Sequence, residues 1–113
     1  MYRVSGEWNV VELSGQVVVP GDDTPFLGFN LNEGRIYGFT GCNRLTAPLN
    51  SEALAEGKVD FSQMGCTRML CHDAKYENAF LDALNSAGKF TVENDTLRMF
   101  NPAGEEVITF LKK

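Results

Sequence analysis

The sequence has no long apolar run, a deficit of positive charge and a single histidine, His72. No stretch approaches the roughly 20 apolar residues that a membrane-spanning helix requires, and the first residues, Met1 to Gly6, lack the apolar core of a secretion signal. Ten Lys and Arg residues stand against 15 Asp and Glu, which gives a net charge of -5. Because this charge repels a phosphate backbone, we expect no nucleic-acid binding, and we expect no membrane span in the sequence.

The length and composition predict one compact domain. The chain has 113 residues, 43% of them hydrophobic, and its eight Phe, three Tyr and one Trp can fill much of a core. Two independent cores are not expected at this size. The sequence has no internal repeat, low-complexity stretch or linker. We therefore expect a single domain over residues 1–113, and we expect it to be monomeric.

Short segments rich in β-branched and aromatic residues alternate with turn residues, a pattern that predicts a meander of antiparallel strands. Gly34 marks the strongest turn, because glycine adopts the positive φ that a short hairpin loop demands. Trp8 is expected to be buried against the C-terminal hairpin, and Ser51 to Gly57 is expected to be an exposed loop. The predicted strands are Glu7 to Leu13, Gln16 to Val19, Phe26 to Leu31, Arg35 to Thr40, Arg44 to Leu49, Lys58 to Gln63, Lys89 to Glu93, Leu97 to Phe100 and Val107 to Leu111.

One segment, Ala74 to Ala87, breaks the period of two. Its apolar residues recur at three- and four-residue spacing, which predicts an amphipathic helix of about four turns lying against the sheet. Asp73 is a good N-cap, Glu77 is favourable near the positive helix end, and Gly88 is expected to close the helix. The predicted buried side chains are Tyr76, Phe80, Ala83 and Leu84, and the predicted exposed ones are Lys75, Asn78, Asp82 and Asn85.

The segment Gly41-Cys42-Asn43 is predicted to form a sharp bend or bulge between two strands. Gly and Asn tolerate positive φ, and the Asn side chain can tie down backbone groups. The Thr67 side chain can likewise tie down backbone groups before the predicted helix. Arg44 follows Asn43, and Arg68 follows Thr67. We expect both to be isolated surface arginines; the alternative is that together they form a patch that binds an anion or an acidic partner.

Two motifs together resemble the signature of the META/HslJ family: Gly41-Cys42-Asn43-Arg44, and later Cys66-Thr67-Arg68-Met69-Leu70-Cys71. In weaker form the resemblance runs from Trp8 to Phe110. It implies a mostly β (α+β) fold, a small antiparallel β-barrel-like sheet with one packed amphipathic helix. It also makes Gly41, Cys42, Asn43, Thr67, Met69 and Cys71 the structural signature. Cys66 is the odd cysteine, because the family commonly has Ser or another small residue there.

The three cysteines allow two main interpretations. If the protein is exported, we expect a disulfide between Cys42 and Cys71, which would close a loop of about 30 residues and contribute about 3.6 kcal/mol. Cys66 would then be a free thiol, because in an extended segment Cys66 and Cys71 lie about 16 Å apart, too far for a bridge. In a reducing cytosol, all three would instead be small buried hydrophobic residues.

Metal binding and catalysis are the alternatives for the same residues. Cys42, Cys66, Cys71 and His72 nominally make a Cys3His zinc site, but the sequence has no C-x2-C knuckle. A thiol enzyme would need Cys42 to meet His72, because neighbouring side chains such as Cys71, His72 and Asp73 do not converge on one another. We expect no catalytic site, no metal and no cofactor.

The expected function follows from the resemblance. META/HslJ proteins are typically bacterial envelope proteins, often lipoproteins, associated with heat-shock and antibiotic-tolerance phenotypes. This implies a non-catalytic domain in the periplasm or outer membrane, acting in stress tolerance or in contacts with a protein or another envelope component, with an export segment and a lipid anchor outside this sequence. The alternatives are a small-ligand-binding barrel and a thiol redox protein.

Overall fold

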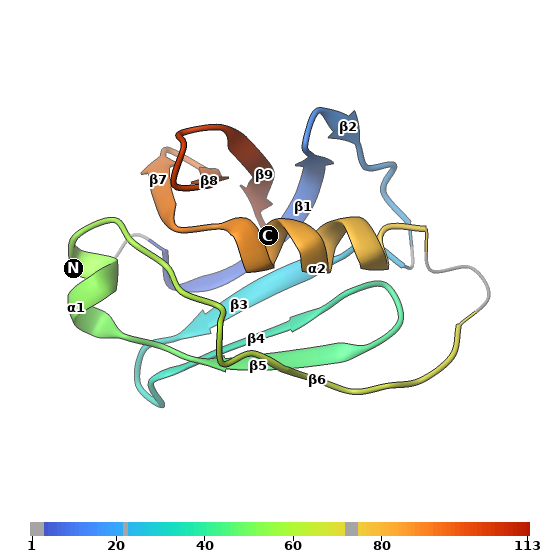
Figure 1. Ribbon diagram of the computed structural model, residues 1–113, viewed down its shortest axis with the longest axis horizontal. Coiled ribbons are helices and arrows are strands. Elements are labelled where there is room, and N and C mark those ends of the chain that lie inside the picture. Colours follow the sequence, from blue (N-terminus) through green and yellow to red (C-terminus); the bar gives the residue numbers. More distant parts are fainter. Residues whose placement is uncertain (1–3, 22, 72–74) are drawn as a thin grey trace.

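The chain forms one large antiparallel sheet with two helices, as the computed structural model describes it over residues 4–21, 23–71 and 75–113 (Figure 1). The fold is therefore mostly β, as predicted. The described strands are β1 Gly6–Leu13, β2 Gln16–Val17, β3 Phe26–Asn30, β4 Arg35–Phe39, β5 Arg44–Pro48, β6 Gly65–Cys66, β7 Lys89–Glu93, β8 Thr96–Phe100 and β9 Glu106–Lys112; the described helices are α1 Ser51–Ala55 and α2 Glu77–Ser86.

The strands follow the order β6-β5-β4-β3-β1-β9-β8-β7, with β2 paired to β1. The sheet bends so that β3 to β6 form one half and β7 to β9 the other, and α2 lies between the two halves (Figure 1). Among the described residues the edge strands β6 and β7 are not paired with each other. The sheet is thus barrel-like in shape without being closed, and α2 fills the opening.

The core lies between the inner faces of the two halves and α2. Trp8 is 1% exposed and pairs with Lys112 of β9, so the predicted anchoring of β1 to the C-terminal hairpin is confirmed. The rings of Phe80 and Phe110 meet edge to face, with centroids 6.4 Å apart. The predicted helical register is also confirmed, because its four apolar residues are buried and its four polar residues are exposed.

The region between β5 and α2 differs from the prediction. The expected loop Ser51 to Gly57 contains helix α1, because Asn50 accepts hydrogen bonds from the backbone N–H groups of Glu52 and Ala53 and so caps it. The expected strand Lys58 to Gln63 is wrong: Lys58 forms only one isolated bridge, to Lys89. The strand lies later, at β6, where two residues pair with β5.

Helix α2 begins at Glu77, three residues later than predicted, with Tyr76 in the N-cap position. The phenol oxygen of Tyr76 accepts a hydrogen bond from the backbone N–H of Val19 at 3.0 Å, which ties the start of α2 to the chain after β2. The predicted N-cap, Asp73, lies outside the described residues. Gly88 follows the C-cap Ala87, as predicted, but its φ is not positive.

Candidate functional site

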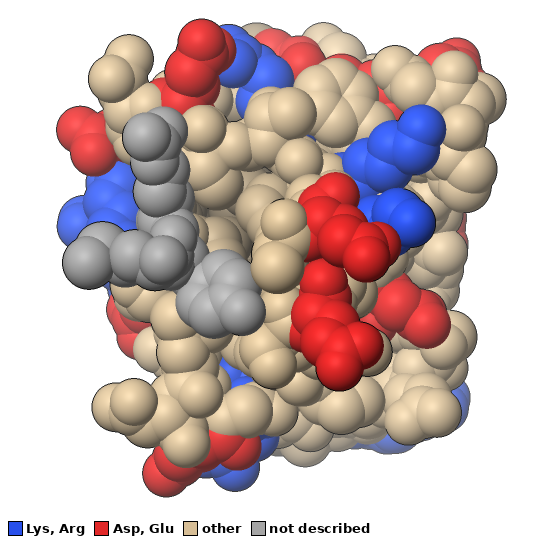
Figure 2. Space-filling model, turned by 90° about the vertical axis from the view of Figure 1, so that its left-hand side faces the viewer, with Lys and Arg blue, Asp and Glu red and all other residues tan. Residues whose placement is uncertain are grey.

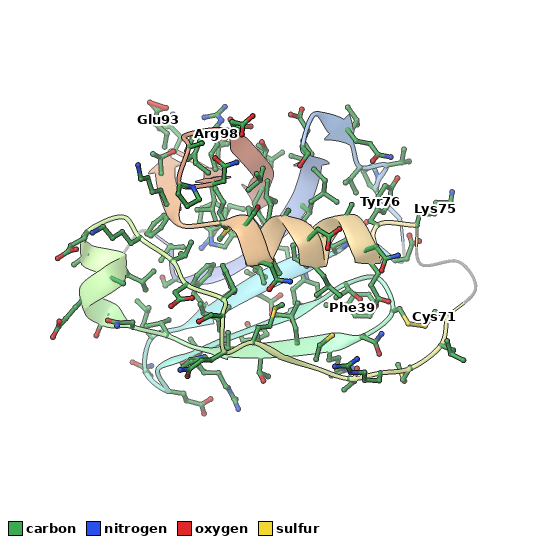
Figure 3. All side chains as sticks on the ribbon, in the orientation of Figure 1. Phe39, Cys71, Lys75, Tyr76, Glu93 and Arg98 are labelled. Carbon is green, nitrogen blue, oxygen red and sulfur yellow. A yellow bond between two sulfur atoms is a disulfide. The ribbon has the colours of Figure 1, made fainter. Side chains whose placement is uncertain are left out.

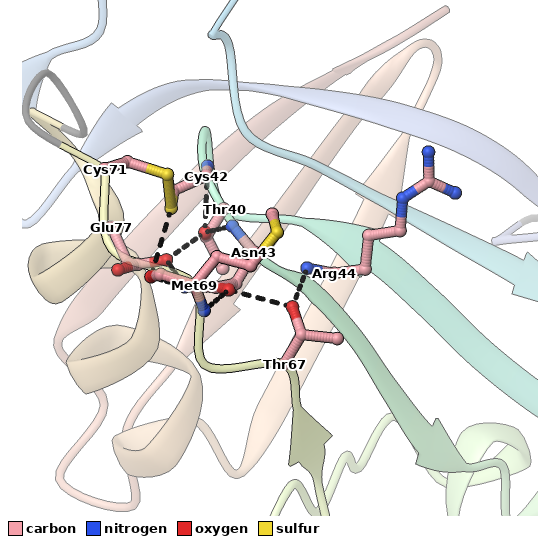
Figure 4. The surroundings of a disulfide bond; sticks show 8 residues. All are labelled: Thr40, Cys42, Asn43, Arg44, Thr67, Met69, Cys71 and Glu77. Atoms are coloured by element: carbon pink, nitrogen blue, oxygen red, sulfur yellow. Dashed lines mark hydrogen bonds between the residues drawn. A yellow bond between two sulfur atoms is a disulfide. The ribbon is translucent and has the colours of Figure 1, made fainter.

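The predicted disulfide joins Cys42, at the bend after β4, to Cys71, which precedes α2 in the chain (Figure 4). Their Cα atoms lie 5.9 Å apart, within the usual range for a bridge. Cys42 is buried and Cys71 is exposed, so the bond connects the core to the surface. Cys66 remains a free, partly exposed thiol.

The bend before the disulfide is held by Thr40 and by a glycine. The hydroxyl oxygen of Thr40 accepts hydrogen bonds from the N–H groups of Cys42 and Asn43, at 3.2 and 2.8 Å. Gly41 has a φ of 99°, and a Cβ there would meet the backbone oxygen of Asp23 at 2.7 Å. Only glycine fits this position, as the sequence predicted.

The side chain of Asn43 is 4% exposed and uses both ends of its amide (Figure 4). Its oxygen accepts from the Met69 N–H at 2.6 Å and from the Thr67 hydroxyl at 2.8 Å. Its nitrogen donates to the Met69 carbonyl oxygen at 3.2 Å and to Glu77 at 2.8 Å. Asn43 therefore joins the bend to the segment that leads to Cys71 and also to helix α2.

Glu77 completes this cluster from the first turn of α2. One carboxylate oxygen, Oε2, accepts from the Thr40 hydroxyl at 2.5 Å as well as from Asn43. The hydrogen bond from Thr40, with a further contribution from Asn43, lowers the pKa of Glu77 below its ordinary value, although partial burial opposes the shift. From the sequence, Glu77 is predicted only to favour the positive end of the helix, because its spacing from Asn43 carries no signal of contact.

The structure brings together all six signature residues. Thr67 forms two bonds to the backbone of Arg44: its hydroxyl oxygen accepts from the Arg44 N–H, and its N–H donates to the Arg44 carbonyl oxygen. Met69 takes part through its peptide groups, while its side chain is 58% exposed. His72, named in the zinc and catalytic alternatives, lies outside the described residues.

The sulfur atoms offer little nucleophilic chemistry. In the disulfide, neither Cys42 nor Cys71 has a thiolate for a metal or a substrate. Burial raises the pKa of the Cys66 thiol, the charge of Glu77 raises it further, and Arg68 only partly opposes this. The free thiol is therefore protonated near neutral pH, the opposite of what a reactive cysteine requires.

A groove of about 890 Å³ lies at the end of the molecule that carries α1. Figure 2 looks onto that end, where acidic side chains gather beside a few basic ones. Three polar residues that line the groove have local partners: Asn50 caps α1, Asp60 accepts from the Ser62 N–H, and Lys58 pairs with Glu56.

The disulfide and the start of α2 lie at one end of the molecule. Cys71 and Tyr76 mark that end, whereas Glu93 and Arg98 lie on β7 and β8 toward the other (Figure 3). The clustered signature thus stabilises one end of a sheet that α2 covers.

Neither described helix is long and apolar enough to cross a bilayer.

Residues 3–113 match the sequence profile of the META domain. This chain belongs to the META domain family. The match confirms the family that the two motifs indicated, and it covers nearly all of the chain. No curated protein shows significant similarity to this META domain.

Two solved structures share the fold of this META domain. One, determined by NMR, is 18% identical with a TM-score of 0.68 over 96% of this chain and 89% of its own. The other is the crystal structure of a DUF4847-family protein from Bacteroides vulgatus, 16% identical with a TM-score of 0.64 over 97% of this chain and 94% of its own. At these identities the likeness is one of fold alone.

Proposed function

We propose that this META domain is a non-catalytic domain of the bacterial cell envelope, located in the periplasm or anchored by lipid to the outer membrane. There it acts in stress tolerance through contacts with other envelope components. The observation that carries this proposal is that the family signature is used for structure: its cysteines form a disulfide and its asparagine has four internal hydrogen bonds. Disulfides persist in oxidising compartments such as the periplasm.

Two features support a non-catalytic role. The interior is filled by large side chains such as Trp8, Phe80 and Phe110, each 1% exposed or less. The one free thiol has a raised pKa. A domain built this way works by presenting a stable surface rather than by transforming a substrate.

The test is fractionation of bacterial cells that express the gene with its natural upstream sequence. The protein is expected in the envelope fraction, and a strain that lacks its META-domain protein should regain heat or antibiotic tolerance when the wild type is supplied. The Cys42→Ser/Cys71→Ser variant should accumulate less and restore less tolerance, whereas Cys66→Ser should behave like the wild type. Recovery of the protein only from the cytosol would contradict the proposal.

The second candidate function is binding of a small ligand, which the groove beside α1 favours by its volume of about 890 Å³. Buried residues such as Leu54 and Val59 line part of it. Specific pockets place a few polar groups so that they converge on the ligand, whereas here Asn50, Asp60 and Lys58 are each engaged with a local partner. The dye 1-anilinonaphthalene-8-sulfonate is a direct probe: saturable enhancement of its fluorescence by the native protein, lost in Leu54→Asp, would favour this candidate.

A further inference from the structure

The outer face of strands β1, β3, β4 and β5 carries a groove lined by aromatic and basic side chains. Strand register aligns Glu7, Gly28, Tyr37 and Thr46 across β1, β3, β4 and β5, and the next row holds Asn9, Phe26, Phe39 and Arg44. A groove of about 640 Å³ lies over these rows. We call this surface the outer sheet face; it is formed by Glu7, Phe26, Arg35, Tyr37, Phe39, Arg44 and Thr46.

Three aromatic rings form the floor of this groove. The Phe26 ring meets Tyr37 edge to face, with ring centroids 6.5 Å apart, and lies tilted against Phe39, with centroids 6.0 Å apart. All three residues are only partly buried. The ammonium group of Lys113 lies 4.3 Å from the centre of the Phe26 ring. Partly exposed aromatic residues beside arginine are the composition that protein interfaces favour.

Tyr37 is held in place before any partner arrives. Its ring lies against Gly28, where an added Cβ would be 2.1 Å from the ring. This lets the phenol donate a hydrogen bond to Glu7 Oε2 at 2.8 Å, while Glu7 Oε1 accepts from Lys113 at 3.0 Å. Both oxygens of the acidic group in the groove are thus already engaged.

The guanidinium groups of Arg35 and Arg44 are less engaged than the carboxylate of Glu7. Among the described residues the Arg35 guanidinium pairs only with Glu33. The side chains of this bridge are 55% and 58% exposed, so it contributes little to stability. The guanidinium of Arg44 points away from the disulfide cluster (Figure 4), and no ion pair joins it to the described residues. In a protein of net charge -5, this face therefore has cations to offer to an acidic ligand.

We infer that the outer sheet face binds an extended acidic segment of a partner protein. An apolar or aromatic residue of that segment packs on Phe26, Tyr37 and Phe39, and flanking carboxylates bind Arg44 and Arg35 through charge-assisted hydrogen bonds. Arg44 is paired opposite Phe39, and Arg35 lies four residues back along β4. At about 3.4 Å per residue the two arginines are about 14 Å apart along the strands, which matches about four extended residues. A long polyanion fits less well, because the few cations lie on an otherwise acidic molecule.

The partner of the proposed function would thus present an acidic segment with an apolar or aromatic residue. That the partner is a protein rests on the proposed function. Selection of random displayed dodecapeptides on the purified, disulfide-bonded domain tests it. Enriched peptides should carry Asp or Glu within about four residues of an aromatic, Leu or Pro side chain. A fluorescein-labelled copy of the strongest peptide should bind the wild type, and its binding should weaken as salt is added.

Two variants test the face itself. Arg44→Glu should weaken peptide binding about tenfold or more, and Phe39→Ala should also weaken it, because the apolar floor is reduced. The matched control is Lys89→Glu, the same charge change at an exposed position of β7, which should bind like the wild type. The backbone bonds of Arg44 to Thr67 do not need its side chain, and near-ultraviolet circular dichroism checks that each variant is folded.

Several results would overturn the inference: no enriched peptide, enrichment without acidic residues, equal loss in Arg44→Glu and Lys89→Glu, or tighter binding of an oligogalacturonate than of the peptides. The last would assign the face to an acidic saccharide. Because these assays use the purified domain, they can fail while fractionation still places the protein in the envelope. A cytosolic location would, conversely, leave the peptide result intact.

Discussion

The side chain of Asn43 pairs with the peptide unit of Met69 as a neighbouring strand would, accepting from its N–H at 2.6 Å and donating to its carbonyl oxygen at 3.2 Å. The two residues are 26 positions apart in the chain. The side-chain amide of Asn43 thus supplies hydrogen-bond partners to the backbone of Met69, in the segment between β6 and Cys71. The disulfide next to this pairing fastens the same two segments covalently.

Asn43→Ala should lower the free energy of unfolding by about 2–4 kcal/mol, because it removes the partner of both Met69 peptide groups and one of the two hydrogen bonds that Glu77 Oε2 accepts. Urea unfolding with the disulfide intact measures this. The control is Asn85→Ala, which changes an exposed asparagine on α2 and should shift stability by less than about 0.5 kcal/mol. Equal effects of the two substitutions would contradict the role given to Asn43.

Glu77 should make stability fall at acidic pH. Its folded pKa lies below the ordinary value of 4.5, so its stabilising contribution is complete above that value and is lost as the pH falls through the folded pKa. Urea unfolding of the wild type and Glu77→Gln at several pH values tests this. The wild type should be more stable at neutral pH, and the gap should shrink below about pH 4.5; a gap independent of pH would count against the assignment.

Phe80→Ala should cost about 3–5 kcal/mol, the range for removing a buried aromatic side chain. The ring is 0% exposed and packs edge to face on Phe110, so its loss leaves a cavity between α2 and β9. Thermal or urea unfolding gives the value. Asp82→Ala, on the exposed side of the same helix, is the control and should be nearly neutral.

Tyr37 should titrate above its ordinary pKa of 10.0, because its phenol donates to the carboxylate of Glu7. Glu7→Gln should bring the pKa of Tyr37 back toward that value. Gly28→Ala should do the same by displacing the ring. An NMR titration that resolves the Tyr37 ring signals measures the shift, and an unchanged pKa in Glu7→Gln would show that the contact is absent in solution.

The parts of the fold that repeat a simple period were predictable from the sequence. The apolar stripe of α2 and the alternation in β4 and β5 each report burial directly, and the structure follows them closely. Helix α1 escaped prediction because it has only five residues and one buried side chain, Leu54, so its cap at Asn50 was the only strong signal. The segment after it alternates like a strand, yet Val59 and Phe61 are buried with almost no strand pairing.

The candidate site was predictable in part. The bend at Gly41 and the backbone role of Asn43 follow from what glycine and asparagine can do, and the Cys42–Cys71 pairing agrees with loop length and geometry. The contacts of Thr40 and Glu77 did not follow, because they depend on how α2 docks against the bend. The same is true of the outer sheet face, where strand register alone aligns residues of β1, β3, β4 and β5.

The most direct test of the structural disulfide is a count of the thiols that react with an alkylating reagent when protein taken from the bacterial envelope is denatured in that reagent without a reducing agent. We predict one reactive thiol, assigned by peptide mass to Cys66, and a Cys42–Cys71 bridge that appears as a single cross-linked fragment. Reduction should then lower stability by about 3.6 kcal/mol. Three reactive thiols in that envelope-derived protein would contradict the claim that the signature is a structural disulfide site.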